Sequence, residues 1–340
     1  MKILHIVPGL CDPTCGIAVA AKEIARRQRA EDKTVELVDP AVFSTATFDL
    51  NLFSEVWVHS MWLPKTMNAA WKVLGARGKA KRENRKVGND SITAISNYHS
   101  SLRLIRMPHG CMDPVKIAYH WSKKLWVAPI ERWLFRRCDW IVSTEVAEDE
   151  WIKGFVGKKC PPIVRISLDP STFDWSRLPL IEPKKGINNI LYVGRLHPLK
   201  GVKYLIRALP KGVKLVIIGK DEGEGVTLKA LAAKLGAEVE FRGVVPEEEK
   251  AAAMRECDLL VLPTLSENYG LVVEEALMCG KRVITTDGAP AWEPVKRNDG
   301  IHSTTSDYNS RLVYLKGFRD GTDDERVRLL TEALMQLENG

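Results

Sequence analysis

The sequence predicts an α/β protein built from two doubly wound domains, each with a parallel sheet. Its 340 residues exceed the size of an ordinary single domain. Short apolar runs alternate with helical segments in two series, and a stretch rich in Pro and Gly separates the series. The apolar runs of the second series are almost continuous, which is typical of parallel strands buried on both faces. These observations favour successive strand–helix–strand units in both halves.

The first predicted domain covers residues 1–173. An Ala-rich helix is expected from about Gly16, after the first strand. The segment 77–90, "RGKAKRENRKVGND", has the least regular pattern and is expected to be a loop. The expected strands are "KILHIVP", "TVELVD", "SEVWVHS", "SLRLIRMP", "DWIVST" and "PPIVRIS".

A linker at 174–188 is expected to lead into the second domain, at 189–320, and a C-terminal helix at 321–340 follows. Helices are predicted at 224–236 and 247–256. The expected strands are "NILYVG", "VKLVIIG", "VEFRG", "DLLVLPT" and "RVITTD".

Composition excludes several classes of protein. Hydrophobic residues make up 45% and charged residues 27%, as in a globular protein with a large core. No apolar run reaches the ~18 residues that a membrane span needs, and the first residues lack signal-peptide features. The seven cysteines are odd in number and only Cys11 and Cys15 are close together, so structural thiols of a cytoplasmic protein are expected. Neither G-x-G-x-x-G nor a P-loop occurs, and no D-x-D motif or His/Cys/Asp cluster suggests a metal.

Basic residues and tryptophans gather in the first half of the chain. Residues 1–180 carry a net charge of +8, the window 61–140 alone carries +11, and 57–151 holds eight of the ten tryptophans. In "YHWSKKLWVAPIERWLFRRCDW", Trp126, Ile130, Trp133 and Leu134 share one helical face. Such a helix suits the surface of an anionic membrane, and it equally suits a core helix with a solvated back.

The ends of the predicted strands hold the chemistry, because ligands of such sheets bind beyond the carboxyl ends of the strands. In "VGRLHPLKG", Arg195 follows a strand directly and Lys200 lies where a helix begins. Two cations beside a helix N-terminus form a phosphate cradle, since charge, donors and helix dipole all favour an anion.

A second strand end, "LSENYGLVVEEALMCG", combines a loop with the start of a helix. Gly270 would let a phosphate approach the backbone amides there. A carboxylate such as Glu267 would repel phosphate unless it binds hydroxyls or a developing cation, and a nucleotide sugar offers both. The pattern alone does not choose between Glu274 and Glu275 as a second functional carboxylate.

Two further turns lie in the first domain. Gly9 and Gly16 bracket the turn after the first strand, and His59 and His109 each follow a strand end. His5 is expected to be structural.

With these motifs in place, the sequence resembles the GT-B glycosyltransferases, and within them the retaining family 4. The resemblance covers 187–295 well and the N-terminal half more loosely. It rests on the strand–G-R-x₄-K turn, the F-R-G turn at 241–243, and an E-x₇-E motif from Glu267 to Glu275 with an aromatic-Gly step. It implies two Rossmann-like domains facing a central cleft.

The resemblance also implies an activity. The protein would be a hexosyltransferase that moves a sugar from a nucleotide sugar, most commonly a UDP-sugar in that family, with retention and without a metal or other cofactor. The acceptor would be a saccharide or a lipid-linked molecule of bacterial surface polysaccharide or lipopolysaccharide synthesis. The expected location is cytoplasmic, with peripheral contact to an anionic membrane surface, and no nucleic acid is expected as a partner.

The resemblance assigns roles residue by residue. Glu267 and His109 would be catalytic, and Glu275 rather than Glu274 would bind the ribose. The remaining positions are Gly16, Arg195, Lys200, Gly270 and Leu271 at the diphosphate, Glu267, Asn268 and Tyr269 at the sugar and ribose, and Gly243 and Val244 on the nucleobase side.

The sequence departs from the family pattern at two places, and two alternative functions stay open. The usual Gly-Gly pair of the N-terminal loop is Cys15-Gly16 here, and an Asn-Gly turn is replaced by "ISLDP". A UDP-sugar 2-epimerase of the same fold and a non-enzymatic nucleotide-sugar-binding module are the alternative functions.

Overall fold

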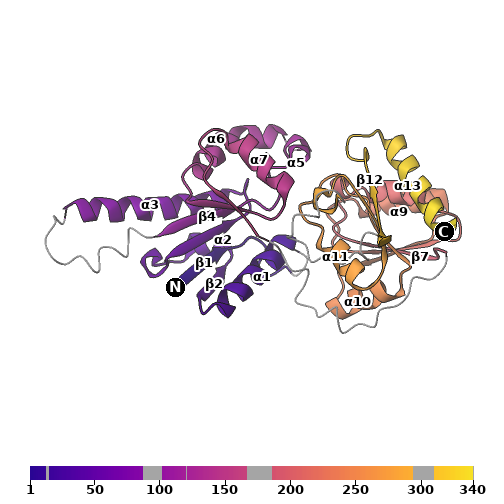
Figure 1. The fold of residues 1–340 in the computed structure, drawn as a ribbon, viewed down its shortest axis with the longest axis horizontal. Helices are drawn as coiled ribbons and strands as arrows, with labels where there is room; N and C mark the ends of the chain where they lie inside the picture. Colours follow the sequence, from indigo (N-terminus) through magenta and orange to yellow (C-terminus); the bar gives the residue numbers. More distant parts are fainter. Residues whose placement is uncertain (13–14, 87–101, 120, 167–185, 294–309, 340) are drawn as a thin grey trace. The chain divides into compact units, whose positions relative to one another are not determined.

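The computed structural model describes residues 1–12, 15–86, 102–119, 121–166, 186–293 and 310–339. The chain divides into two compact units, Met1–Leu168 and Asp169–Gly340 (Figure 1). Most of the predicted linker, 174–185, and the "ISLDP" turn from 167 onward lie outside the described residues.

The first unit holds a six-stranded sheet in the order β2-β1-β3-β4-β5-β6, and every neighbouring pair is parallel. In Figure 1, α1 and the pair α6–α7 lie on opposite sides of this sheet. Each predicted strand of this half is present. The elements in chain order are β1 (Lys2–Ile6), α1 (Gly16–Ala30), β2 (Thr34–Val38), α2 (Pro40–Thr45), η1 (Leu50–Leu52), β3 (Glu55–His59), α3 (Pro64–Lys86), β4 (Arg103–Met107), α5 (Pro114–Tyr119), α6 (Trp121–Phe135), β5 (Trp140–Ser143), α7 (Val146–Val156) and β6 (Ile163–Arg165).

The second unit holds another parallel six-stranded sheet, in the order β12-β11-β10-β7-β8-β9. Helix α8 contacts both α9 and α13, while α10 packs against β7 and α11 packs against β10 and β11. The elements are β7 (Asn189–Val193), η3 (Pro198–Lys200), α8 (Val202–Ala208), β8 (Lys214–Ile218), α9 (Gly225–Leu235), β9 (Val239–Gly243), α10 (Glu247–Glu256), β10 (Leu259–Leu262), α11 (Leu271–Met278), β11 (Arg282–Thr286), η4 (Pro290–Trp292), β12 (Leu312–Leu315) and α13 (Asp323–Asn339).

Burial explains why the central strands read as continuous apolar runs. All four residues of β10 are buried, and so are the three middle residues of β7. Helices cover both faces of a parallel sheet, so neither side chain direction reaches water. The second unit therefore has one continuous core on both sides of β7 and β10.

Three expectations need correction. The segment 77–86 continues α3 as a helix rather than a loop, because Ala, Arg, Lys and Glu are all good helix formers; residues 87–90 lie outside the description. The short strand β12 was missed, since "LVYL" alone carries no distinctive pattern. On α6, Leu134 is buried, but Trp126 is 84% exposed and Ile130 is exposed too, so that helical face is only partly core.

Candidate functional site

The order of the second sheet identifies where a ligand of this unit would bind. From β7 the chain proceeds outward to β8 and β9, and then returns to β10 on the other side of β7. The loops after β7 and β10 therefore flank the point where the strand order reverses, which is where doubly wound sheets hold their ligands. These are the loops that carry Arg195, Lys200 and Glu267.

The loops after β7 and β10 are joined by hydrogen bonds. The amide of Leu265 donates to the carbonyl of Leu199 at 2.8 Å, and the hydroxyl of Thr264 donates to the same carbonyl at 3.2 Å. Gly201 has φ +65°, and a Cβ there would lie 2.0 Å from the carbonyl oxygen of Pro263. Only glycine permits this close approach, so the local sequence fixes the two loops against each other.

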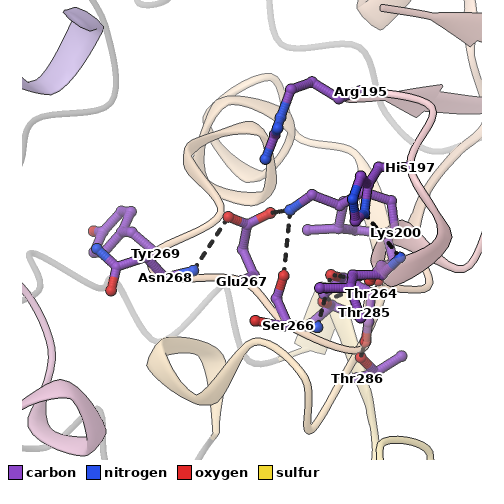
Figure 2. Close-up of polar contacts among 12 residues, drawn as sticks. Arg195, His197, Lys200, Thr264, Ser266, Glu267, Asn268, Tyr269, Thr285 and Thr286 are labelled. Atoms are coloured by element: carbon purple, nitrogen blue, oxygen red, sulfur yellow. Dashed lines mark hydrogen bonds and ion pairs between the residues drawn. The ribbon is translucent and has the colours of Figure 1, made fainter. Parts of the chain in front are cut away.

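Lys200 and Glu267 form an ion pair at the centre of this region (Figure 2). Lys200 is 7% exposed, and its ammonium also donates to the carbonyl of Ser266 at 3.4 Å. The amide of Glu267 donates to the carbonyl of Gly288 at 2.7 Å, which ties the residue to the loop after β11. A cation and a carboxylate are thus held side by side by three loops.

Arg195 adds a second cation. Its side chain extends from the end of β7 toward the Lys200–Glu267 pair in Figure 2. It donates to the carboxylate of Glu222 at 2.8 Å, and its carbonyl accepts from the hydroxyl of Tyr192 at 2.9 Å. The guanidinium stays partly exposed, with 46% of its side-chain surface open to solvent.

The start of α11 lies directly after Glu267. Gly270 caps the helix with φ +76°, and Leu271 is its first residue. The indole of Trp292 donates to the carbonyl of Tyr269 at 2.6 Å, while the amide of Asn268 donates to the Glu267 carboxylate at 3.2 Å. The first amides of a helix have no partner within it, so this end presents donors beside the two cations.

Glu275 occupies a different setting from Glu267. It is buried one turn into α11, and its two carboxylate oxygens both accept from the Lys250 ammonium at 3.1 Å. Burial raises the pKa of Glu275 to about 6, although Lys250 acts in the opposite direction. Glu274 instead accepts a hydrogen bond from the hydroxyl of Tyr269 at 2.8 Å.

The predicted nucleobase-side residues lie at the end of β9, where Gly243 is the last residue of the strand and Val244 follows it. The carbonyl of Gly243 accepts from the amide of Gly219 at 2.7 Å, and Val244 is exposed. Because β9 is the edge strand two positions from β7, these residues are separated in the sheet from the loops that hold Lys200 and Glu267.

Gly16 and His109 belong to the first unit. Gly16 is the first residue of α1, and a Cβ there would meet no atom within 4 Å in the part of the chain that is described. His109 follows β4 with φ +54°, a conformation that residues other than glycine rarely adopt. Its ring contacts that of His59, with a 2.8 Å hydrogen bond between the two.

The sequence analysis did not identify several side chains that form ion pairs or hydrogen bonds at or next to the predicted site residues. Glu222 pairs with Arg195, Lys250 pairs with Glu275, and the buried Glu148 accepts from the Gly110 amide next to His109. Each lies 25 or more residues from its partner, so local spacing carries no signal for it. Among the described residues, no group of three or more His, Cys, Asp and Glu side chains is arranged to hold a metal ion.

Comparison with known protein families gives a match that lies wholly within the second unit. Residues 180–310 match the family model of the glycosyl transferases group 1. A D-inositol 3-phosphate glycosyltransferase of Mycobacterium bovis is 36% identical over 123 residues, which are 34% of this chain and 25% of the relative. The D-inositol 3-phosphate glycosyltransferase of Mycobacterium ulcerans is 33% identical over 123 residues, which are 34% of this chain and 26% of the relative. The chain thus spans about a quarter of the length of these curated relatives.

Solved structures are similar over the whole chain. The structure of WaaG, described as a glycosyltransferase involved in lipopolysaccharide biosynthesis, matches with a TM-score of 0.62 and 16% identity, covering 99% of this chain and 92% of that one. Anabaena HepE, determined with UDP and glucose, matches with a TM-score of 0.60 and 17% identity, covering 100% and 95%. The chain has the GT-B fold of two Rossmann-like domains, as the sequence predicts.

Proposed function

We propose that this protein is a glycosyltransferase that moves a sugar from a nucleotide sugar to a hydroxyl-bearing acceptor. The observation that carries the proposal is the convergence of Arg195, Lys200, Glu267 and the α11 N-terminus where the strand order of the second sheet reverses. Two cations and a helix start suit a diphosphate, while a neighbouring carboxylate suits sugar hydroxyls. The match of this segment to the group 1 glycosyl transferases supports the same conclusion.

In the proposed reaction, Arg195 and Lys200 take up the negative charge that develops on the leaving nucleoside diphosphate, together with the amides at Gly270 and Leu271. Such preorganised charges act where the transition state becomes charged. In the structure, Lys200 is already held by Glu267, so its position is fixed before any ligand arrives. Glu267 itself faces the transferred sugar, whose anomeric carbon becomes positive in the transition state.

The remaining roles follow the resemblance to family 4. Glu275 binds the ribose, Asn268 and Tyr269 contribute to the sugar and ribose pocket, and His109 attends the sugar and acceptor. The reaction retains the anomeric configuration, and cationic side chains rather than a metal ion stabilise the leaving group. A UDP-sugar is the proposed donor, which the UDP in the HepE structure supports.

An anionic membrane is the proposed working surface, with a lipid-linked or lipopolysaccharide acceptor. The support is that five large apolar side chains at the end of α5 and along α6 are exposed, three of them aromatic: Tyr119, Trp121, Leu125, Trp126 and Ile130. Exposed aromatic side chains in a basic region suit the membrane interface, and each well-placed Lys or Arg adds roughly 1 kcal/mol on anionic lipid. Among the described residues no helix has the length and apolar character of a bilayer span.

A thermal-shift screen followed by a turnover assay tests the proposal. A nucleotide that binds the folded state raises its melting temperature by mass action. We expect UDP or another nucleoside diphosphate to stabilise the protein, and its nucleotide sugar to release that diphosphate faster when acceptor is present. Release of free epimerised UDP-sugar would identify an epimerase, and stabilisation without turnover would identify a binding module.

A further inference from the structure

Three histidines form a buried, hydrogen-bonded row across the first sheet. His5 on β1, His59 at the end of β3 and His109 just after β4 come from neighbouring strands. Nδ1 of His5 lies 2.8 Å from Nε2 of His59, and Nδ1 of His59 lies 2.8 Å from Nε2 of His109. Adjacent ring centroids are 5.1 Å apart in both pairs. The fourth member is Gln28 on α1, whose Oε1 lies 2.8 Å from Nε2 of His5.

The row has a direction, because a neutral imidazole carries one N–H and one acceptor nitrogen. The carbonyl oxygen of Gln28 can only accept, so Nε2 of His5 must donate to it. Nδ1 of His5 then accepts from Nε2–H of His59. Nδ1 of His59 accepts in turn from Nε2–H of His109. One amide group thus determines the position of three protons in succession.

All three rings are held neutral by their surroundings. Burial lowers the pKa of His5 to about 4 and that of His109 to about 3. Burial also lowers the pKa of His59, and its two histidine neighbours add to the effect. Nearby positive charges act in the same direction, since Arg29 lowers the pKa of His5 further and Lys116 lowers that of His109. Near neutral pH each ring therefore carries a single proton.

The far end of the row is held in a strained position. His109 has φ +54°, a left-handed backbone conformation that residues with a Cβ rarely adopt. The next amide, that of Gly110, donates to the carboxylate of the buried Glu148, which also accepts from the amide of Thr144. His109 is 8% exposed, and its Nδ1 has no hydrogen bond to the residues that the structure describes.

We propose that Gln28, His5 and His59 are positioning residues that hold His109 as the Nε2–H tautomer, so that its Nδ1 accepts a hydrogen bond from a substrate hydroxyl. The hydroxyl belongs to the transferred sugar or to the acceptor, and this assignment rests on the proposed function. The row makes His109 a hydrogen-bond acceptor and excludes it as a donor through Nδ1. A strained backbone fixed at a functional position is consistent with such a role.

Nitrogen-15 NMR of histidine-labelled protein tests the tautomer without any substrate. Long-range ¹⁵N–¹H correlations separate the protonated ring nitrogen from the bare one, and single His→Gln variants assign the signals. We expect His5, His59 and His109 each to show a protonated Nε2 and a bare Nδ1 between pH 6 and 8. A protonated Nδ1 on His109, or a mixture of tautomers, would overturn the proposal.

Two variants of the amide test its controlling role. Gln28→Met removes the acceptor, so the His109 signals should change to a mixture of tautomers, whereas Gln28→Glu keeps an acceptor and should preserve the pattern. Gln336→Met, at an exposed position on α13, is the matched control and should change nothing. Unchanged His109 signals in folded Gln28→Met would contradict the inference.

Kinetics separate this inference from the proposed function. Gln28→Met should lower kcat about tenfold with an unchanged KM for the donor, by analogy with residues that hydrogen-bond to metal-bound histidines, whose mutation costs about 10–100-fold. A changed tautomer with unchanged kcat would overturn the positioning role. If wild-type protein shows the expected tautomers but transfers no sugar, the proposed function fails and the tautomer assignment stands.

Discussion

Replacing Glu275 by Gln should stabilise the folded protein while impairing its function. Glu275 is 5% exposed, and burial raises its pKa from an ordinary 4.5 to about 6 even though Lys250 contacts both of its oxygens. This difference in pKa corresponds to about 2 kcal/mol by which the folded state disfavours the ionised carboxylate. A neutral amide of the same shape avoids that cost. Lys250 keeps a partner in the variant, because its ammonium nitrogen also lies 2.6 Å from a carboxylate oxygen of Glu247.

The pH dependence gives the prediction its sign. Because the folded-state pKa lies above the unfolded value, the destabilisation is complete well above pH 6 and fades as the pH falls through 6 toward 4.5. The free energy of unfolding of the variant should therefore exceed that of wild type by about 2 kcal/mol at pH 8 and by less than about 1 kcal/mol at pH 5. For a unit of this size, the larger figure corresponds to roughly 4–8 °C in melting temperature.

Urea denaturation at both pH values, followed by circular dichroism, measures the difference. Glu274→Gln is the matched control, since that side chain accepts from Tyr269 and an amide oxygen can do the same. Donor titration should show a higher donor requirement and lower turnover for Glu275→Gln only. Destabilisation of Glu275→Gln at pH 8, or a gain in stability that does not change with pH, would refute the reasoning. Greater loss of activity in Glu274→Gln would show that the motif is misaligned.

Three further predictions concern charge, metal and membrane. Arg195→Ala and Lys200→Ala should each weaken nucleoside diphosphate binding by about 1.5–3 kcal/mol in calorimetry, because each variant loses a charge-assisted contact. The surface control Arg207→Ala should bind as wild type does. Unchanged affinity in both Arg195→Ala and Lys200→Ala would refute the proposed phosphate site. EDTA should leave sugar transfer intact, and full loss restored by Mg²⁺ or Mn²⁺ would contradict a metal-independent reaction. Trp126→Ser should reduce co-sedimentation with anionic vesicles at low salt, and equal, negligible pelleting of wild type with anionic and neutral vesicles would exclude the membrane role.

The sequence predicted the sheets well because burial on both faces leaves a visible mark. Strands such as β7 and β10 are continuous apolar runs bounded by Gly or Pro, and the turns after them contain Arg195, Lys200 and Glu267. By contrast, β12 is four residues long, and the charged end of α3 has no apolar periodicity to indicate a helix.

The side-chain pairings were beyond the reach of the sequence. Gln28, His5, His59 and His109 are separated by 23 to 54 residues, and only the order β1-β3-β4 brings the three histidines together. His5 was therefore expected to be structural when taken alone. The pairing of Glu275 with Lys250 likewise depends on how α10 and α11 pack, which no local motif records.

A crystal structure of the protein with the nucleoside diphosphate that gives the largest thermal shift tests the central claim most directly. The account predicts that the diphosphate lies within hydrogen-bond distance of Arg195, Lys200 and the amides of Gly270 and Leu271, with the ribose hydroxyls at Glu275. A nucleotide bound away from the loops that follow β7 and β10, with no contact between its phosphates and Lys200, would contradict it.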